Sequence, residues 1–81
     1  MTRDNLSQIV IKETVCKRLR ELRSIANHTR NEIARKLNIA TQTYYQYERG
    51  DRNIPYELIV NLAVYYGVDT DYIFGLKGAE Q

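Results

Sequence analysis

Two short helices with marked ends, separated by only three residues, constrain the fold of this chain more than any other feature. Thr29 and Glu32 have the spacing of a capping box, in which each side chain bonds the backbone amide of the other, so a helix is predicted to open directly after Thr29. Asn38 favours the left-handed conformation that ends a helix. After a three-residue connection, a second helix is predicted over residues 41–49, ended by Gly50. Helices this close in the chain must pack against each other through a tight turn.

A further helix is predicted before this pair. Apolar residues recur there at intervals of three and four, on one helical face: Val15, Leu19, Leu22 and Ala26. We expect the helix to begin between Ser7 and Glu13 and to end near Asn27. The β-branched run within residues 8–11 is compatible with a helix, a short strand or a partly disordered arm.

Two more helices are predicted near the C-terminal end. Pro55 suits the first position of a fourth helix, and Gly67 stops that helix. Its apolar face comprises Leu58, Ile59, Leu62, Ala63 and Tyr66. Asp69 is placed to cap a fifth helix over residues 70–74, which Gly75 closes.

These elements predict one compact, all-α domain of five helices. We assign residues 12–76 to the domain, residues 1–11 to an N-terminal extension that is helical or partly disordered, and residues 77–81 to a C-terminal tail. A chain of 81 residues is too short for a deep enzyme cleft. Its one histidine has no nucleophile or carboxylate at a catalytic spacing, and no glycine loop could cradle a phosphate, so we expect no enzyme activity.

Composition favours a particular cellular location for the protein and argues against metal binding and membrane insertion. The single cysteine, Cys16, allows neither an intrachain disulfide nor a cysteine zinc cluster, which suits a reducing cytoplasm. No apolar run approaches the ~20 residues of a membrane span, and the start of the sequence lacks a signal-peptide pattern. We therefore expect a cytoplasmic protein with no metal, no cofactor, no membrane contact and no small-molecule ligand.

Charge is distributed unevenly. Residues 12–36 contain eight basic and three acidic side chains, whereas residues 53–81 contain one basic and four acidic ones. The basic half could face a polyanion while the acidic end points away from it. A solvated helix face would carry the same charges, so this pattern alone leaves both interpretations open.

Several motifs follow one another in a fixed order over about residues 15–76. They are LRELR at residues 19–23, TRNEIA at residues 29–34, YERG at residues 47–50, IP at residues 54–55, LA at residues 62–63 and DYIFG at residues 71–75. Together they resemble the XRE family of phage Cro and repressor-type domains. The resemblance implies a lambda-repressor-like helix-turn-helix domain that binds double-stranded DNA, with residues 41–49 as the recognition helix in the major groove.

The helix over residues 41–49 carries the candidate base readers. Tyr44 and Tyr47 are three apart and should turn toward the other helices. The opposite face comprises Thr41, Gln42, Tyr45 and Gln46. Gln42 is the first candidate, because a glutamine amide pairs bidentately with adenine. The alternative is that all four are simply polar surface residues.

Phosphate contacts are predicted around this helix. Arg30 opens the preceding helix, where the family usually has a glutamine that meets a phosphate, and arginine strengthens such a contact through its charge. Further candidates are Thr43, Arg49 and Arg52. Each could instead be an ordinary solvent-exposed side chain. The resemblance also implies a structural ion pair between Arg23 and Glu48 that orients the recognition helix.

Three positions depart from the family pattern or carry reactive groups. Ala40 stands where a serine or threonine usually caps the recognition helix, so the start of that helix is less firmly fixed. His28 occupies a position that is usually leucine, and we interpret it as a partly buried structural residue rather than a metal ligand or pH switch. Cys16 is interpreted as a packing or surface residue rather than a redox sensor.

The apolar fifth helix and the tyrosines before it need either a partner or a fold-back onto this chain. We predict a dimer surface comprising Tyr65, Tyr66, Tyr72, Ile73, Phe74 and Leu76. The predicted function is a sequence-specific transcriptional regulator, a repressor acting as a homodimer on a palindromic operator. Two alternatives stay open: a protein-interaction module of the same fold, antitoxin-like or an anti-regulator partner, and a nonspecific DNA binder.

Overall fold

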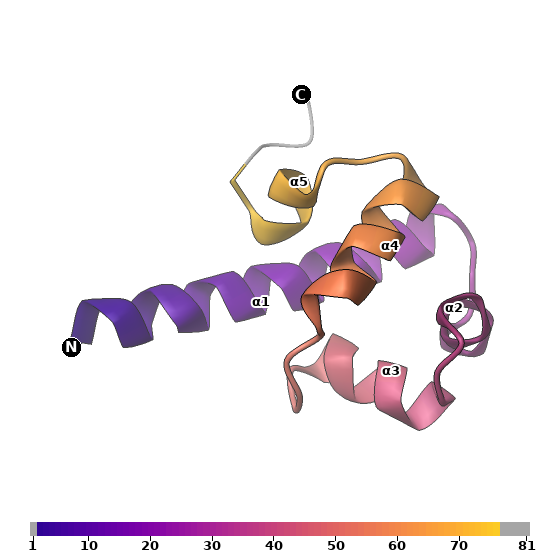
Figure 1. Ribbon diagram of the computed structural model, residues 1–81, viewed down its shortest axis with the longest axis horizontal. Coiled ribbons are helices and arrows are strands. Elements are labelled where there is room, and N and C mark those ends of the chain that lie inside the picture. The colour runs from indigo at the N-terminus through magenta and orange to yellow at the C-terminus, as the bar shows by residue number, and fades with distance from the viewer. Residues whose placement is uncertain (1, 77–81) are drawn as a thin grey trace.

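A computed structural model describes the backbone of residues 2–76 and the side chains of residues 11–76. The described residues form five helices and no strand (Figure 1). The helices are α1 (Thr2–Ile25), α2 (Arg30–Leu37), α3 (Thr41–Arg49), α4 (Tyr56–Tyr66) and α5 (Thr70–Phe74). The all-α prediction is confirmed. The tail predicted over residues 77–81 lies outside the described residues.

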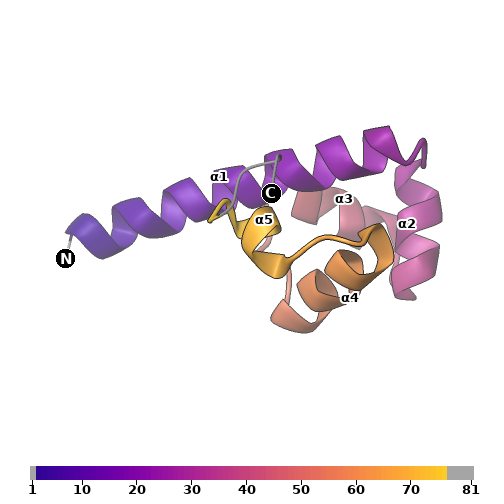
Figure 2. The ribbon, with the colours of Figure 1, turned by 90° about the horizontal axis from the view of Figure 1, so that it is seen from above.

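Helix α1, with 24 residues, is the longest of the described helices. Its second half lies beside the other helices, and its first turns extend beyond them (Figures 1 and 2). The helix starts at Thr2, so the predicted start between Ser7 and Glu13 is wrong. Apolar periodicity marks only the part of a helix that packs on a core, whereas residues 2–25 contain neither proline nor glycine to interrupt the helix earlier.

The end of α1 also differs from the prediction. The helix stops at Ile25, and Asn27 adopts a left-handed φ of 60°. Ala26 therefore lies outside the helix and is exposed, although spacing had placed it on the apolar face. None of the helices in the described part of the chain combines the length and hydrophobicity required to cross a membrane.

The helix ends around α2 and α3 follow the local sequence signals. The Thr29 amide donates to Glu32 Oε1 over 2.7 Å, and the Glu32 amide donates to Thr29 Oγ1 over 3.1 Å, which confirms the capping box. Asn38 and Gly50 adopt left-handed conformations, with φ of 60° and 83°. Ala40 holds the N-cap position of α3 and makes no side-chain capping bond. The predicted bounds of both helices are confirmed.

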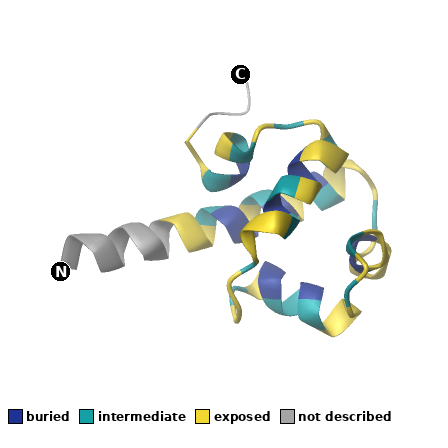
Figure 3. Ribbon diagram, viewed as in Figure 1, coloured by how far each residue is buried: buried dark blue, intermediate teal, exposed yellow. Residues whose placement is uncertain are grey.

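Every helix contributes to one core (Figure 3). Its buried members are Val15, Leu19, Leu22, Ile33, Ala34, Tyr44, Tyr47, Ile59, Leu62, Ala63 and Ile73. Partly buried side chains such as Leu58 and Tyr66 pack against it. Because α2 and α3 each bury only a few residues, their placement depends on this shared core more than on their own helical propensity.

The last two helices differ in how they begin, and a glycine lets α5 pack closely against α1. Pro55 and Asp69 occupy the N-cap positions of α4 and α5, and the Asp69 side chain makes no capping bond to the helix, unlike the sequence prediction. Gly75 has a φ of 86°, and a Cβ added there would lie 2.6 Å from Thr14 Cγ2. Glycine at this position therefore permits both the turn and the close approach of α5 to α1.

Candidate nucleic-acid interface

Helices α2 and α3 pack together and are joined by three residues, 38–40. The two faces of α3 differ sharply in exposure. Tyr44 is 0% exposed and Tyr47 is 6% exposed, which confirms that both turn inward. Gln42 is exposed, and Gln46 is half-buried on the side away from the core. We define the outer face of α3 as the set Thr41, Gln42, Tyr45, Gln46 and Arg49.

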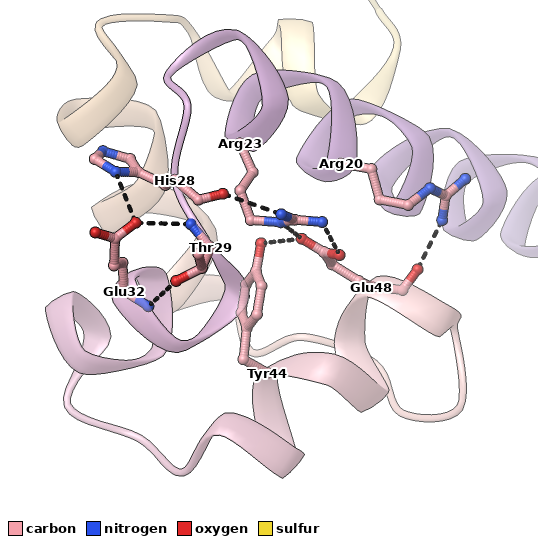
Figure 4. Close-up of polar contacts among 7 residues, drawn as sticks. All are labelled: Arg20, Arg23, His28, Thr29, Glu32, Tyr44 and Glu48. Atoms are coloured by element: carbon pink, nitrogen blue, oxygen red, sulfur yellow. Dashed lines mark hydrogen bonds and ion pairs between the residues drawn. The ribbon is translucent and has the colours of Figure 1, made fainter.

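A buried ion pair fixes the inner side of α3 (Figure 4). Arg23 Nε donates to Glu48 Oε2 over 2.7 Å, and Arg23 Nη2 donates to Glu48 Oε1 over 3.2 Å. Arg23 Nη1 also donates to the carbonyl of His28 over 3.0 Å. Glu48 is 2% exposed, so its charge is compensated by protein groups. The hydrogen bonds to Glu48 raise the pKa of Arg23 further above its ordinary value.

Two more side chains complete this network around Glu48. The Tyr44 hydroxyl donates to Glu48 Oε2 over 2.7 Å, and burial together with this carboxylate raises the pKa of Tyr44 strongly. Arg20 Nη1 donates to the Glu48 carbonyl over 2.8 Å. Three side-chain bonds from α1 therefore hold α3 at Glu48, and the fourth bond, from Tyr44, lies within α3. The sequence motifs predicted the ion pair but neither of these two partners.

The outer face of α3 is held by polar contacts to α2. The Thr41 hydroxyl donates to Asn31 Oδ1 over 2.6 Å, so this candidate base reader already has a partner. The guanidinium carbons of Arg30 and Arg49 lie 4.5 Å and 5.4 Å from the centre of the Tyr45 ring. Asn31 was not among the residues predicted from sequence, although its position next to Arg30 at the start of α2 was a usable signal.

The predicted phosphate-binding residues surround the same face. Arg30, Arg49 and Arg52 are exposed, and Thr43 is half-buried. Arg49 Nε lies 3.5 Å from Asp51 Oδ2. Arg52 Nη1 donates to Gln46 Oε1 over 3.4 Å. Three accessible guanidinium groups therefore lie around the amides on the outer face of α3.

The residues predicted for a dimer surface divide into three groups. Leu76 is 72% exposed and Tyr65 is 42% exposed. Tyr66, Tyr72 and Phe74 are half-buried. Ile73 is 0% exposed, and its assignment to an interface is corrected, because it folds back into the core of its own chain. The periodic pattern could not distinguish such a fold-back from a partner contact.

The two potentially reactive side chains, His28 and Cys16, both contact neighbouring groups of the fold. His28 Nε2 lies 2.6 Å from the Tyr65 hydroxyl, and His28 Nδ1 lies 3.6 Å from Glu32 Oε1, so the ring bridges α4 and α2. Within the described residues no group of three metal-ligating side chains is present. Cys16 is buried, its thiol donates to the Tyr47 carbonyl over 3.3 Å, and burial raises its pKa.

A short helix, a three-residue turn and a second helix with a polar outer face define the helix-turn-helix class. The sequence profile of the helix-turn-helix family matches residues 19–73. The chain belongs to this family, in its XRE-type branch. Its five-helix fold is the fold that this membership predicts.

Two relatives come from Bacillus subtilis (strain 168). The chain is 41% identical over 61 residues to the uncharacterized HTH-type transcriptional regulator YobD, covering 75% of this chain and 54% of that protein. It is 41% identical over 59 residues to the HTH-type transcriptional regulator ImmR, covering 73% of this chain and 46% of that protein. The chain thus spans about half the length of these relatives. No solved structure matches it.

Proposed function

We propose that this chain binds a specific sequence in double-stranded DNA and regulates transcription. The observation that carries the proposal is the contrast within α3: its inner face is fixed by a buried network, while Gln42 is exposed on its outer face beside three accessible arginines. Family membership and the two relatives called transcriptional regulators support the same function.

Helix α3 is proposed to enter the major groove. The major groove is about 12 Å wide, which is sufficient for the diameter of an α-helix. The nine residues of α3 make the helix about 14 Å long. Gln42 is proposed to read adenine through a bidentate amide contact, with Gln46 as the second reader one turn later. Thr41 approaches the groove edge with its hydroxyl already oriented by Asn31. Because α3 is fixed from below, these amides meet the bases without reorganisation of the core.

The exposed arginines are proposed to bind the DNA backbone. Arg30 opens α2, where the backbone amides and the guanidinium charge both favour a phosphate. Arg49 and Arg52 follow at the other end of α3, and Thr43 supplies a hydroxyl. These contacts set the position of the helix in the groove, whereas the glutamines select the sequence.

We further propose a homodimer that represses transcription from a palindromic operator. Two copies would place their recognition helices ~34 Å apart on one side of the duplex. The proposed surface retains the accessible members of the predicted set: Tyr65, Tyr66, Tyr72, Phe74 and Leu76. Sedimentation equilibrium tests this part, and a monomer at high concentration, with or without operator DNA, would contradict it.

Selection of bound duplexes from a random pool tests the function directly. We expect one palindromic sequence to be enriched. Gln42→Ala should then cost ~1–3 kcal/mol at one or two base positions, because the bidentate contact is lost. Arg30→Ala should weaken all duplexes alike and reduce the slope of log K against log salt by about 0.9. Asn61→Ala, which removes an exposed amide from α4, is the matched control.

The alternatives give different outcomes in the same experiment. A nonspecific binder retains duplexes without enriching a sequence, and its affinity responds equally to Gln42→Ala and Arg30→Ala. A protein-interaction module retains no duplex at all. The exposed polar character of α3 favours DNA over an interaction module, because protein interfaces prefer aromatic and aliphatic anchors at their centre.

A further inference from the structure

The side chain of Tyr45 contacts two cations that come from different helices. Arg30 is the first residue of α2, and its guanidinium carbon lies 4.5 Å from the centre of the Tyr45 ring. Arg49 is one turn further along α3, with its guanidinium carbon 5.4 Å from the same ring. The tyrosine is half-buried and both arginines are exposed. One half-buried ring therefore contacts two long, exposed, charged side chains.

We propose that Tyr45 is a positioning residue that holds Arg30 and Arg49 for two DNA phosphates, rather than a reader of bases. This inference rests on the proposed DNA binding and assigns Tyr45 a different part in it. A ring that already contacts two guanidinium groups has less surface left for a sugar or a thymine methyl. Tyr45 thereby joins the charged edge of the interface, while Gln42 remains the candidate for base recognition.

The electrostatics of the Tyr45 ring explain how it would position Arg30 and Arg49. The negative face of an aromatic ring attracts guanidinium groups, and it limits the rotamers that each arginine samples. Less conformational entropy is then lost when the arginines bind phosphates. Two like charges on one ring also repel each other, and a polyanion relieves that repulsion. The pair of Arg49 with Asp51, at 3.5 Å between half-exposed groups, competes only weakly with a phosphate.

The contact itself is tested first, in the protein without DNA. Side-chain NMR of the arginine Nε–Hε groups should show ring-current shifts for both Arg30 and Arg49. The shifts should disappear in Tyr45→Leu and persist in Tyr45→Phe, because the ring and not the hydroxyl produces them. Absence of these shifts in the wild-type chain would overturn the inference while leaving the proposed function intact.

Binding to the enriched duplex and to a scrambled duplex is measured next, over a range of salt concentrations. Tyr45→Leu should weaken binding to both duplexes by the same factor, about tenfold, since each of two cation–π contacts adds to arginine positioning. The salt slope should fall, by at most about 2, because the arginines that are no longer held on the ring neutralise their two phosphates less fully. Tyr45→Phe should stay within about twofold of the wild type, since its ring retains the face that attracts the guanidinium groups.

Three controls test whether the effect is specific to Tyr45. Asn61→Ala should change neither affinity nor slope, and thermal unfolding should show that Tyr45→Leu remains folded. In a chain that also carries Arg30→Gln and Arg49→Gln, Tyr45→Leu should have almost no further effect.

If Tyr45→Leu instead alters the preferred base at one or two positions with an unchanged salt slope, Tyr45 reads bases and the inference is wrong. A wild-type chain that binds no duplex would remove the proposed function itself.

Discussion

The inner and outer faces of α3 present two different kinds of surface on one nine-residue helix. Beneath the helix, Tyr44 and Glu48 are almost fully buried, and Glu48 accepts bonds from three side chains of the protein. On the outer face, Gln42 is exposed. The hydrogen bonds there join Thr41 to Asn31 of α2 and Gln46 to Arg52 of the following loop. Stability is therefore concentrated on one side of the helix.

The difference implies that substitutions on the outer face of α3 can change its surface without changing the fold of the domain. A buried carboxylate must keep all its partners, because leaving it without them carries a large desolvation cost. An exposed amide already has water as its partner, so its replacement hardly affects folding. Substitutions on each side of α3 test whether the two faces are as independent as this implies.

The largest effect is expected from Arg23→Ala. The substitution leaves the Glu48 carboxylate buried without its cation, which should lower the free energy of unfolding by about 3–5 kcal/mol. Glu48→Gln should cost less, because the remaining Arg23 side chain is 18% exposed and reaches water. Urea denaturation of both variants measures the difference. Equal losses would show that the carboxylate is less isolated than its 2% exposure indicates.

Alkaline pH should destabilise the same inner face. Burial and the Glu48 carboxylate raise the pKa of Tyr66 from 10.0 to about 12 and raise that of Tyr44 further. The unfolded chain therefore loses these protons first, so stability is full below pH 10 and falls as pH rises toward 12. By pH 11 the loss should be about 3 kcal/mol, on the order of 1.4 kcal/mol for each tyrosine. Denaturation at a series of pH values checks this, and Tyr44→Phe should roughly halve the fall.

The hydroxyls of Tyr44 and Tyr66 provide a matched pair at neutral pH. The Tyr44 hydroxyl donates to Glu48, so Tyr44→Phe should cost about 1.5–3 kcal/mol, the value of a hydrogen bond to a charged group. The Tyr66 hydroxyl is buried and has no hydrogen-bond partner within the described part of the chain. Tyr66→Phe should therefore be neutral or slightly stabilising. Thermal or urea unfolding that ranks the two variants in the opposite order would contradict the network as described.

The smallest effect is expected on the outer face. Gln42→Ala should change the free energy of unfolding by less than about 0.5 kcal/mol, because the side chain is exposed and makes no core contact. Denaturation alongside the DNA-selection experiment separates stability from recognition in one variant. A larger loss of stability would show that the two faces are coupled through α3.

The local features of this fold could be predicted from sequence because they depend on residues a few positions apart. The Thr29–Glu32 capping box and the left-handed stops at Asn38 and Gly50 belong to this class. The start of α1 could not be predicted, because its first turns lie outside the packed stripe that periodicity detects. For α5, the pattern identified an apolar helix but not that Ile73 turns into its own core.

In the candidate site, too, features set by residues close in sequence could be predicted and features set by helix packing could not. Helical spacing was sufficient to separate Tyr44 and Tyr47 from Gln42 on opposite sides of α3. The bond between Thr41 and Asn31 joins residues ten positions apart, and that between Arg20 and Glu48 joins residues twenty-eight apart. Such pairs depend on how the helices pack, which no short sequence window contains.

The burial of Cys16 has a practical consequence. The thiolate is the form that reacts with alkylating reagents, and burial of the chain's single cysteine raises its pKa and limits reagent access. Native protein should therefore resist maleimide labelling without any background mutation. A cysteine introduced at an exposed position, such as Asn61→Cys, would then carry a spectroscopic probe selectively, and a distance measured between two such probes would test the proposed homodimer.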